Sequence, residues 1–475
     1  MIPIRHYVAR RRDLLSRLER PALLFAGGEI PRNSPFMTYP LRADSNFLLF
    51  FPPPEPDACA FFDPQDGTVT LFLHERTEVD ALWMGPRPSF DELAAALEVD
   101  RVLPVEQLER DLEWLRKGRV VDSIAVPDAR ATELARKITG QPLDLYEPSQ
   151  LAPSGLRDAL AALRMRKAPL ELDEMRHAGT ITAEAFAAAI LSTRPGRSER
   201  ELAALVDGIF AKYGGYPAYA TILSVRGEIL HNHGHEGVLA EGDLLLVDAG
   251  TEVESGWGAD VTRTWPVDGR FSPEQRDVYE TVLAAQEAAI ARCRSGVRWR
   301  DVHIAATRVI AEGLHGMGLL RVSVDDAVSR GAAGLFFPHG LGHLLGLDTH
   351  DLRTFGDAVL YGPGRSRSTE PGLAFLRMDL DLAPGMVVTV EPGLYFVPAI
   401  LHSRATRERL AEVVDFDRAE KFLAANDGRG FGGVRIEDDV LVTDGAPEVL
   451  TPSVPKEIRD LEAALESART ATAAR

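Results

Sequence analysis

The sequence predicts a two-domain α/β protein, in which an N-terminal α/β domain precedes a C-terminal antiparallel sheet cradled by helices. Three observations lead to this prediction. The chain has 475 residues, more than one hydrophobic core usually organises. Short β-rich runs alternate with helical patterns in the first part of the chain. In the second half, short strand-like runs end in Gly or Pro turns, which suits an antiparallel sheet packed on helices.

The bulk composition excludes several classes of partner. The chain is 45% hydrophobic and 26% charged, with a formal net charge of −18, which argues against nucleic acid or an anionic membrane as a partner. No apolar stretch approaches the roughly 20 residues that span a bilayer. The basic segment 1–20 lacks the apolar core of a signal peptide, so we predict a helix and a cytoplasmic location. Cys59 and Cys293 are too few for a disulfide framework and are expected as buried small hydrophobic residues.

The N-terminal region combines strand-like and helical segments. It contains no phosphate-binding glycine pattern and no cluster of metal-type ligands, so we expect a supporting domain. The expected strands are PALLFAGG (21–28), NFLLFF (46–51), ACAFFD (58–63) and TVTLFLH (68–74), and the expected helices are FDELAAALEV (90–99) and ATELARKI (131–138).

The domain boundary is expected at a break between two helices. Residues 153–184 have a helical pattern that Pro169 interrupts. Because proline pushes the preceding residue out of the helical region, we predict two helices that meet at this proline. The predicted domains are therefore residues 1–160 and residues 161–475.

The C-terminal region carries the segments whose residues could bind metal or take part in catalysis. Its expected strands and turns contain five metal-type ligands at their ends, and its expected helices cover residues 272–293 and 299–318. The segments are GDLLLVDAGTEV (242–253), GADVTRTWPV (258–267), FPHGLGHLLGLDTHD (337–351), PGMVVTVEPGLYFV (384–397) and GGVRIEDDVLVTDG (432–445).

The five candidate ligands are one histidine and four carboxylates. Asp248 ends one apolar strand and Asp260 begins the next, so both carboxylates converge if the two strands pair. A single acid on a strand is more often solvated or paired. Several buried strands that each end on an acid would leave unpaired charge at several kcal/mol apiece unless a cation collects them. The predicted ligands of two divalent metals are Asp248, Asp260, His343, Glu391 and Glu437.

Such a pair of metals predicts hydrolysis. Two ions about 3.5 Å apart can share a hydroxide, lower its pKa and polarise a carbonyl oxygen. Amide or phosphoester cleavage follows naturally. Three histidines, His231, His339 and His350, are placed to donate hydrogen bonds or shuttle protons nearby. His233 and His235 fit a solvated loop better.

Five motifs in fixed order resemble a known family. VDAG, GADVTRTWP, HGLGHLLGLDTHD, VTVEPGLY and GVRIEDDVLVT are similar to the proline-specific metallopeptidases of the pita-bread fold, aminopeptidase P and prolidase, over about residues 155–455. The N-terminal region resembles the α/β domain of the creatinase/prolidase type, with RADSNFLLFF and ALWMG at the corresponding places. The resemblance implies two divalent ions, most often Mn²⁺ with Co²⁺, Zn²⁺ or Fe²⁺ as alternatives, a small peptide with proline at its second position, and a homodimer.

The resemblance also implies a role for each residue of the site. Asp248 would be a terminal ligand of one metal, and His343 and Glu391 would bind the other. Asp260 and Glu437 would bridge the two ions. Glu391 would also act as general base and acid. His231 and His350 would stabilise the tetrahedral intermediate, with His339 supporting them.

Residues outside the ligand set favour a dipeptidase. A dipeptidase should hold the free proline carboxylate with a cation, and arginine binds a carboxylate bidentately. STEPGLAFLRMDLDLAPGM resembles the prolidase segment that supplies this arginine, here Arg377, and Arg435 matches a second family arginine near the product carboxylate. The long insertion between GLYFVPAIL and RGFGGVRIED is typical of prolidases.

Other interpretations remain open at this point. Aminopeptidase P, acting on longer X-Pro peptides, is the main alternative. A phosphotriesterase activity is possible because the same hydroxide can attack phosphorus, and would be a promiscuous side activity. A metal-free creatinase-like enzyme and a non-catalytic peptide-binding module are disfavoured, because all five ligands are present. His231-Asn232 departs from the His-Tyr of many relatives, so the resemblance does not define the preference for the residue before proline. Residues 361–370, YGPGRSRSTE, could form a mobile lid or a solvated loop.

Overall fold

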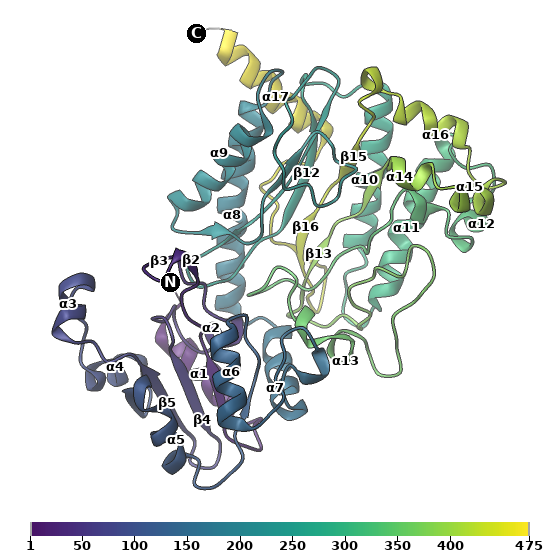
Figure 1. Cartoon of the computed structure of the whole chain (residues 1–475). Helices are drawn as coiled ribbons and strands as arrows, with labels where there is room; N and C mark the ends of the chain where they lie inside the picture. The colour runs from purple at the N-terminus through teal and green to yellow at the C-terminus, as the bar shows by residue number, and fades with distance from the viewer. Residues whose placement is uncertain (1, 474–475) are drawn as a thin grey trace. The chain divides into compact units, whose positions relative to one another are not determined.

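The computed structural model describes residues 2–473 and divides into two compact units, each considered by itself (Figure 1). The first comprises residues 2–171, Glu254–Gly256 and Leu352–Val359, and the second comprises the other described residues from Leu172. The units divide at residues 171 and 172, inside the helix Pro169–Ser192, and the domain boundary expected after residue 160 stays a prediction.

The first unit is built on a mixed sheet with the strand order β6-β5-β4-β1-β7. β4 pairs antiparallel with β1 and β5, whereas β7 and β6 run parallel to their neighbours. This arrangement confirms the predicted N-terminal α/β domain. The elements are α1 (Ile4–Leu15), β1 (Ala22–Phe25), β2 (Pro31–Ser34), β3 (Met37–Thr38), α2 (Ser45–Leu48), β4 (Cys59–Asp63), β5 (Thr68–Leu73), α3 (Glu78–Met84), α4 (Phe90–Leu97), β6 (Arg101–Pro104), α5 (Leu108–Leu115), β7 (Asp122–Ser123), α6 (Ala129–Thr139) and α7 (Ser154–Met165).

One predicted strand is wrong. NFLLFF begins as helix α2, which starts after Asp44, whose side chain accepts a hydrogen bond from the backbone N–H of Asn46. The four residues of α2 are buried. A continuous apolar run has neither a period of two nor a period of 3.6, so its pattern does not distinguish a strand from a buried helix. The N-cap aspartate decides the outcome.

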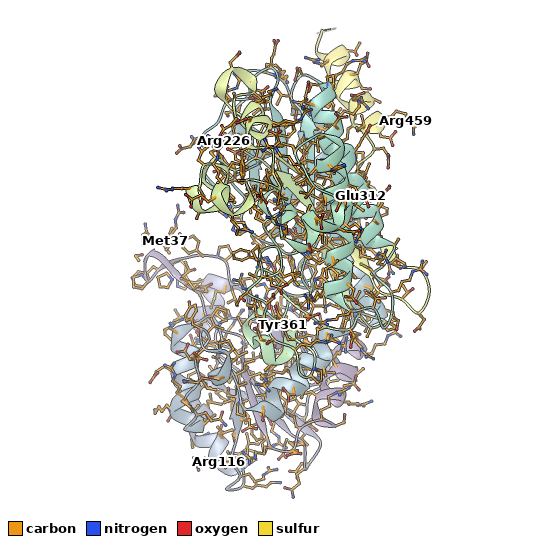
Figure 2. The ribbon with its side chains drawn as sticks, turned by 90° about the vertical axis from the view of Figure 1, so that its right-hand side faces the viewer. Met37, Arg116, Arg226, Glu312, Tyr361 and Arg459 are labelled. Atoms are coloured by element: carbon orange, nitrogen blue, oxygen red, sulfur yellow. The ribbon has the colours of Figure 1, made fainter. Side chains whose placement is uncertain are left out.

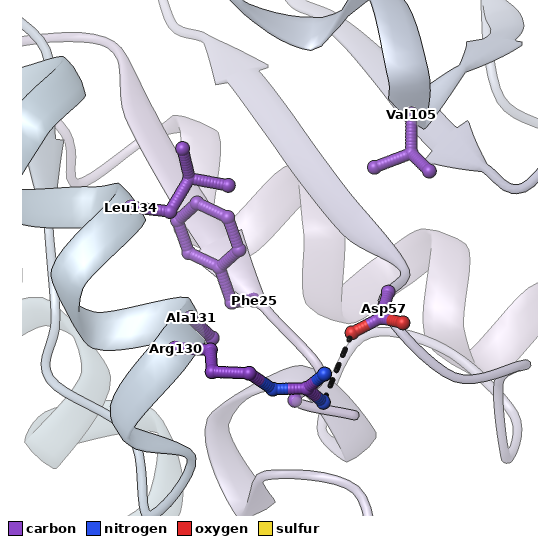
Figure 3. A pocket seen from close by; sticks show the side chains of 7 residues that line it. Phe25, Asp57, Val105, Arg130, Ala131 and Leu134 are labelled. Atoms are coloured by element: carbon purple, nitrogen blue, oxygen red, sulfur yellow. Dashed lines mark ion pairs between the residues drawn. The ribbon is translucent and has the colours of Figure 1, made fainter. Parts of the chain in front are cut away.

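The periphery of this unit is partly apolar. In Figure 2, Met37 lies on the protruding β2–β3 hairpin, and its side chain is 61% exposed. A cavity of about 190 Å³ lies elsewhere in the unit, where Arg130 and Asp57 pair at 3.9 Å (Figure 3). The residues lining this cavity are Phe25, Gly27, Asp57, Val105, Arg130, Ala131 and Leu134, which include no histidine.

The two helices predicted around Pro169 are confirmed. α7 ends at Met165 and α8 (Pro169–Ser192) begins with the proline itself. The first helical position tolerates proline because its N–H would have no partner there in any case. Among the described residues, no helix has both the length and the apolar character needed to cross a membrane.

The second unit contains short antiparallel strands flanked by long helices, as the sequence predicted. Its helices are α8, α9 (Glu199–Lys212), α10 (Pro273–Ile290), α11 (Trp299–Gly316), α12 (Val324–Ser329), α13 (Asp357–Leu360), α14 (Pro398–Leu401), α15 (Arg404–Leu410), α16 (Phe416–Leu423) and α17 (Ile458–Ala473), with part of α13 assigned to the first unit. Its strands are β8 (Tyr216–Pro217), β9 (Ile222–Ser224), β10 (Leu244–Ala249), β11 (Thr251–Glu252), β12 (Val261–Pro266), β13 (Val387–Val390), β14 (Gly393–Tyr395), β15 (Gly433–Arg435), β16 (Asp438–Leu441) and β17 (Glu448–Val449).

The strands form small sheets that meet at one place. The orders are β12-β10-β9 and β13-β16-β17, with β14 paired to β15 and β11 paired to β8. An antiparallel bridge between Thr262 and Glu437 joins the first of these sheets to the second. Because β10, β12 and the β15–β16 junction converge there, the acids at their ends are brought to one region.

Candidate metal centre

The register of the strands aligns three of the predicted ligands. β10 and β12 pair with Asp248 opposite Thr262, and Thr262 in turn bridges Glu437. The Glu437 carboxylate accepts a hydrogen bond of 2.6 Å from the Thr262 hydroxyl. Asp260 stands just before β12, two residues from Thr262. Backbone pairing therefore places all three carboxylates at one level of the sheet.

The glycine-rich HGLGH segment delivers the histidine. The backbone N–H of His343 donates to the Thr389 hydroxyl at 3.1 Å, and the Thr389 N–H donates to the His343 carbonyl at 2.9 Å. A Cβ on Gly342 would lie 2.0 Å from the Thr389 carbonyl oxygen, so only glycine allows this approach. The N–H of Glu391 donates to the Leu341 carbonyl at 2.8 Å. The segment thus runs along β13 and holds His343 beside Glu391.

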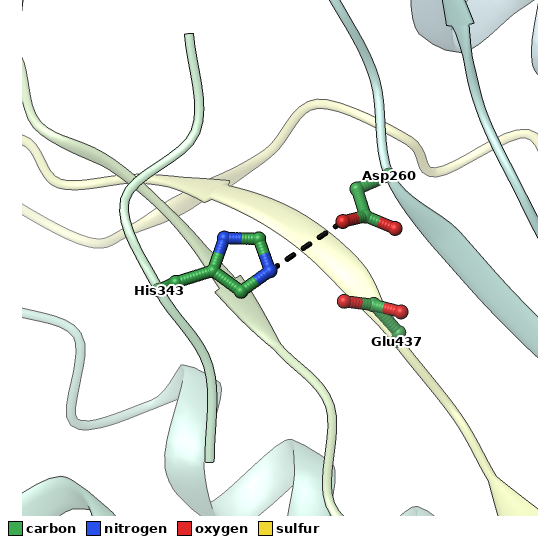
Figure 4. A group of neighbouring side chains, drawn as sticks. All are labelled: Asp260, His343 and Glu437. Atoms are coloured by element: carbon green, nitrogen blue, oxygen red, sulfur yellow. Dashed lines mark ion pairs between the residues drawn. The ribbon is translucent and has the colours of Figure 1, made fainter. Parts of the chain in front are cut away.

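The side chains form a compact cluster (Figure 4). One ligand atom each from Asp260, His343 and Glu437 lies within 4.8 Å of the other two, and all three residues are buried. The His343 Nε2 atom is 3.5 Å from Asp260 Oδ2 and 3.7 Å from Glu391 Oε1. Four of the five predicted ligands are therefore in direct proximity.

His343 has the orientation of a metal ligand. Its Nδ1 atom lies 3.0 Å from the Leu344 carbonyl. A carbonyl only accepts, so Nδ1 carries the proton and Nε2 presents its lone pair to the carboxylates.

Asp248 joins the cluster through Tyr219, which the sequence analysis missed. The Tyr219 hydroxyl lies 2.6 Å from Asp248 Oδ1 and 2.5 Å from Asp260 Oδ1. Burial raises the pKa of this phenol well above its usual value, so the hydroxyl keeps its proton. The single hydroxyl proton of Tyr219 can be donated to only one of the two carboxylates at a time. The other carboxylate oxygen then faces the hydroxyl oxygen, and this repulsion between two acceptors is relieved by a further proton or by a cation. Tyr219 stands in an ordinary AYAT segment that carries no sequence signal.

The electrostatics of the cluster fit a divalent cation. Burial raises the pKa of the Asp248, Glu391 and Glu437 carboxyl groups, and for Glu437 the negative charges of Asp260, Glu391 and Asp248 raise it further. Converging carboxylates without a counter-charge disfavour ionisation. A set of hard oxygen donors with one imidazole is the donor set of Mn²⁺, Co²⁺, Zn²⁺ or Fe²⁺.

Arg435 and Tyr395 border the cluster on another side. The Arg435 guanidinium pairs with Asp248, donates to the Thr262 hydroxyl at 3.0 Å and to the Tyr395 hydroxyl at 3.1 Å. Arg435 is thus hydrogen-bonded to a predicted ligand. Tyr395 was also missed, although it follows Glu391 in the EPGLY motif.

The predicted histidines occupy different positions. His339 Nδ1 contacts the Gly340 carbonyl at 2.9 Å and its Nε2 contacts the Tyr395 hydroxyl at 2.8 Å, so Tyr395 donates to it. Burial lowers the pKa of His339 to about 3, so it is neutral near pH 7. The His350 ring centroid is 4.4 Å from that of His343. His231 is exposed and stacks with His233 at 6.3 Å, and its role in the site stays a prediction.

Arg377 lies within electrostatic range of the cluster. Burial is the largest effect on both groups, lowering the pKa of His339 and raising that of Glu391; the Arg377 charge adds to the first shift and opposes the second. The side chain is partly buried. A second cationic side chain therefore influences Glu391 besides Arg435.

Comparison with known sequences agrees with this geometry. A sequence model of metallopeptidase family M24 matches residues 173–444, and a model of the aminopeptidase P N-terminal domain matches residues 7–121. The fold and the buried cluster define a two-domain metallopeptidase. The chain belongs to metallopeptidase family M24.

Similar proteins cover nearly the whole chain. The Xaa-Pro aminopeptidase of Escherichia coli (strain K12) is 34% identical over 97% of this chain and 97% of its own length. The Xaa-Pro dipeptidase of Homo sapiens is 31% identical over 98% of this chain and 94% of its own length. Among solved structures, Pseudomonas aeruginosa aminopeptidase PepP superposes with a TM-score of 0.81 at 32% identity, covering 99% of both chains. Zn-substituted E. coli aminopeptidase P in complex with product gives 0.81 at 31% identity, covering 98% of this chain and 99% of its own.

Proposed function

We propose that the chain is a dinuclear metal-dependent dipeptidase that hydrolyses the amide bond before proline in Xaa-Pro dipeptides. The choice of a dipeptidase rests on Arg377, a partly buried cation directly after Leu376, whose backbone packs against Gly340 beside His339. A free carboxylate at the C-terminus of the substrate would be bound by such a cation. A longer peptide continues past proline and has no carboxylate at that place.

The proposed ligands are the five residues of the predicted set. Asp248 would hold one ion, His343 and Glu391 would hold the other, and Asp260 and Glu437 would contribute to both. The close approach of Asp260, His343 and Glu437 and the link from Asp248 through Tyr219 support this assignment. When bound, two divalent ions supply a hydroxide nucleophile near neutral pH and polarise the scissile carbonyl.

The protein side chains have distinct proposed tasks. Glu391 would accept a proton from the nucleophile as it attacks and would deliver that proton to the proline nitrogen as the amide bond breaks. His339 remains neutral and is fixed by Tyr395. His350, packed against His343, and His231 donate hydrogen bonds to the developing oxyanion. Arg435 pairs with Asp248 and orients it. A contact between Arg435 and the product carboxylate remains a prediction.

The alternative is an Xaa-Pro aminopeptidase. It is favoured by the similarity to the E. coli Xaa-Pro aminopeptidase, whereas the similarity to the human Xaa-Pro dipeptidase favours our choice. Helices α15 and α16 occupy the insertion that the sequence analysis associated with prolidases. Together with Arg377 this insertion supports the dipeptidase.

The test compares two substrates in one variant. Arg377→Ala should lower kcat/KM for Leu-Pro by at least about 30-fold, the equivalent of the roughly 2 kcal/mol lost when one partner of a buried charge pair is truncated. The value for Leu-Pro-Pro should stay within about 3-fold, since that substrate has no carboxylate at the same position. Equal losses for both substrates would overturn the proposal.

We also propose a homodimer that forms through the first unit. Helix α3 has no buried residue and exposes Val79, Leu82, Trp83 and Met84. Exposed apolar groups of this size are typical of interaction surfaces. Sedimentation velocity should show a dimer for the native chain and a monomer for Trp83→Asp; a monomeric native chain contradicts it. The cytoplasmic location stays a prediction.

A further inference from the structure

The segment that leads to Arg377 is held in place from several directions. The Leu376 residue is 3% exposed and directly precedes Arg377. A Cβ on Gly340 would lie 3.1 Å from Leu376 Cα and 2.8 Å from the Phe375 carbonyl oxygen. The backbone before Arg377 therefore lies against the glycine that follows His339.

A tyrosine and an arginine share the Leu376 carbonyl. The buried Tyr361 hydroxyl donates to this oxygen at 2.9 Å, and the Arg367 guanidinium donates to it at 2.7 Å. The same guanidinium lies over the Tyr361 ring, 5.3 Å from its centroid. The two donors thus form one unit around a single backbone oxygen.

The backbone of Tyr361 pairs with the chain that follows Arg377. Tyr361 forms a parallel bridge with Asp379, and the Asp379 N–H donates to the Leu360 carbonyl at 2.9 Å. The Asp379 carboxylate is held by Arg298. Tyr361 (labelled in Figure 2) therefore contacts the chain both before and after Arg377 and leaves the residue between little freedom.

We propose that Tyr361, assisted by Arg367, is a positioning residue that sets the location of Arg377 and thereby the recognition of the substrate carboxylate. This inference rests on the proposed dipeptidase function. In the segment 361–370, which is largely an exposed loop, the buried Tyr361 would then hold the specificity arginine in place. Tyr361 is the stronger contributor because its hydrogen bond is buried, whereas Arg367 is exposed.

The experiment uses the metal-loaded, full-length enzyme with Leu-Pro and Leu-Pro-Pro. Tyr361→Phe should raise KM for Leu-Pro about 5- to 20-fold, as expected for one lost hydrogen bond that orients a charged group, with kcat within about 3-fold. KM for Leu-Pro-Pro should change by less than about 3-fold. Arg367→Met should have a smaller effect in the same direction. Arg365→Met is the matched control, because Arg365 lies on the same segment but binds Asp381 and the Asp379 carbonyl.

The double variant separates positioning from general stability. In an Arg377→Ala background, Tyr361→Phe should leave the Leu-Pro to Leu-Pro-Pro ratio unchanged within about 2-fold, because the residue that it positions is gone. An unchanged KM for Leu-Pro in Tyr361→Phe, equal losses for both substrates, or a further loss of selectivity in the double variant would overturn the inference. Arg377→Ala alone decides the proposed function: if it spares Leu-Pro while Tyr361→Phe does not, the dipeptidase assignment fails and Tyr361 acts by another route.

Discussion

Removal of the Tyr219 hydroxyl should weaken metal binding more than it weakens the fold. This hydroxyl contacts both Asp248, at 2.6 Å, and Asp260, at 2.5 Å, so Tyr219→Phe removes one contact from each of two proposed ligands, while Arg435 still pairs with Asp248. Partners that orient ligands in this way typically contribute a factor of about 10 to 100 in metal affinity, which corresponds to roughly 1.4–2.7 kcal/mol. The ring stays in place, so the loss of packing is small.

The assay is titration of chelator-stripped protein with Mn²⁺ by calorimetry. The matched control is Tyr279→Phe, which removes a second buried hydroxyl that donates to the Lys456 carbonyl at 2.6 Å. The control should lower the melting temperature and leave the Mn²⁺ affinity unchanged. If Tyr219→Phe binds Mn²⁺ as tightly as the native chain, the hydroxyl does not organise the ligands and the reasoning is refuted.

Two further predictions concern the unliganded cluster and the glycine beneath it. Because burial raises the carboxyl pKa of Asp248, Glu391 and Glu437, the chelator-stripped native state keeps protons that the unfolded chain releases above about pH 4. Its melting temperature should fall as pH rises from 5 towards neutral while Mn²⁺ affinity increases; a flat or rising profile contradicts this. Gly342→Ala should cost about 1–3 kcal/mol and weaken Mn²⁺ binding, because its Cβ would lie 2.0 Å from the Thr389 carbonyl oxygen. The control is Gly208→Ala on α9, where an added Cβ would meet no atom within 4 Å, so its free energy of unfolding in denaturant titration should be unchanged or higher. Equal losses of stability in Gly342→Ala and Gly208→Ala would refute the steric argument.

Much of the fold could be predicted because local patterns were unambiguous. Pro169 marked the joint between α7 and α8, and the strand-like segments that contain Asp248 and Asp260 became the paired strands β10 and β12, with Asp260 directly before β12. NFLLFF failed because a continuous apolar run has no diagnostic period, and the Asp44 cap favours a helical turn.

The site was predictable only where it sits in motifs. His343 and the acids at strand ends stand out because a charge at the end of a buried strand needs a partner. Tyr219 and Tyr361 act through hydrogen bonds to residues far along the chain, so no local pattern indicates them. The ion pair between Arg435 and Asp248 likewise depends on how β15 packs near β10, and the distance between these residues in the sequence does not reveal that packing.

The most direct test of the dipeptidase assignment is the ratio of kcat/KM for Leu-Pro to that for Leu-Pro-Pro, measured with the native chain after loading with Mn²⁺. Capture of the free proline carboxylate by Arg377 predicts that the dipeptide is the better substrate, by about 30-fold if the charge pair contributes roughly 2 kcal/mol. Faster turnover of the tripeptide would contradict the assignment and would make the chain an Xaa-Pro aminopeptidase.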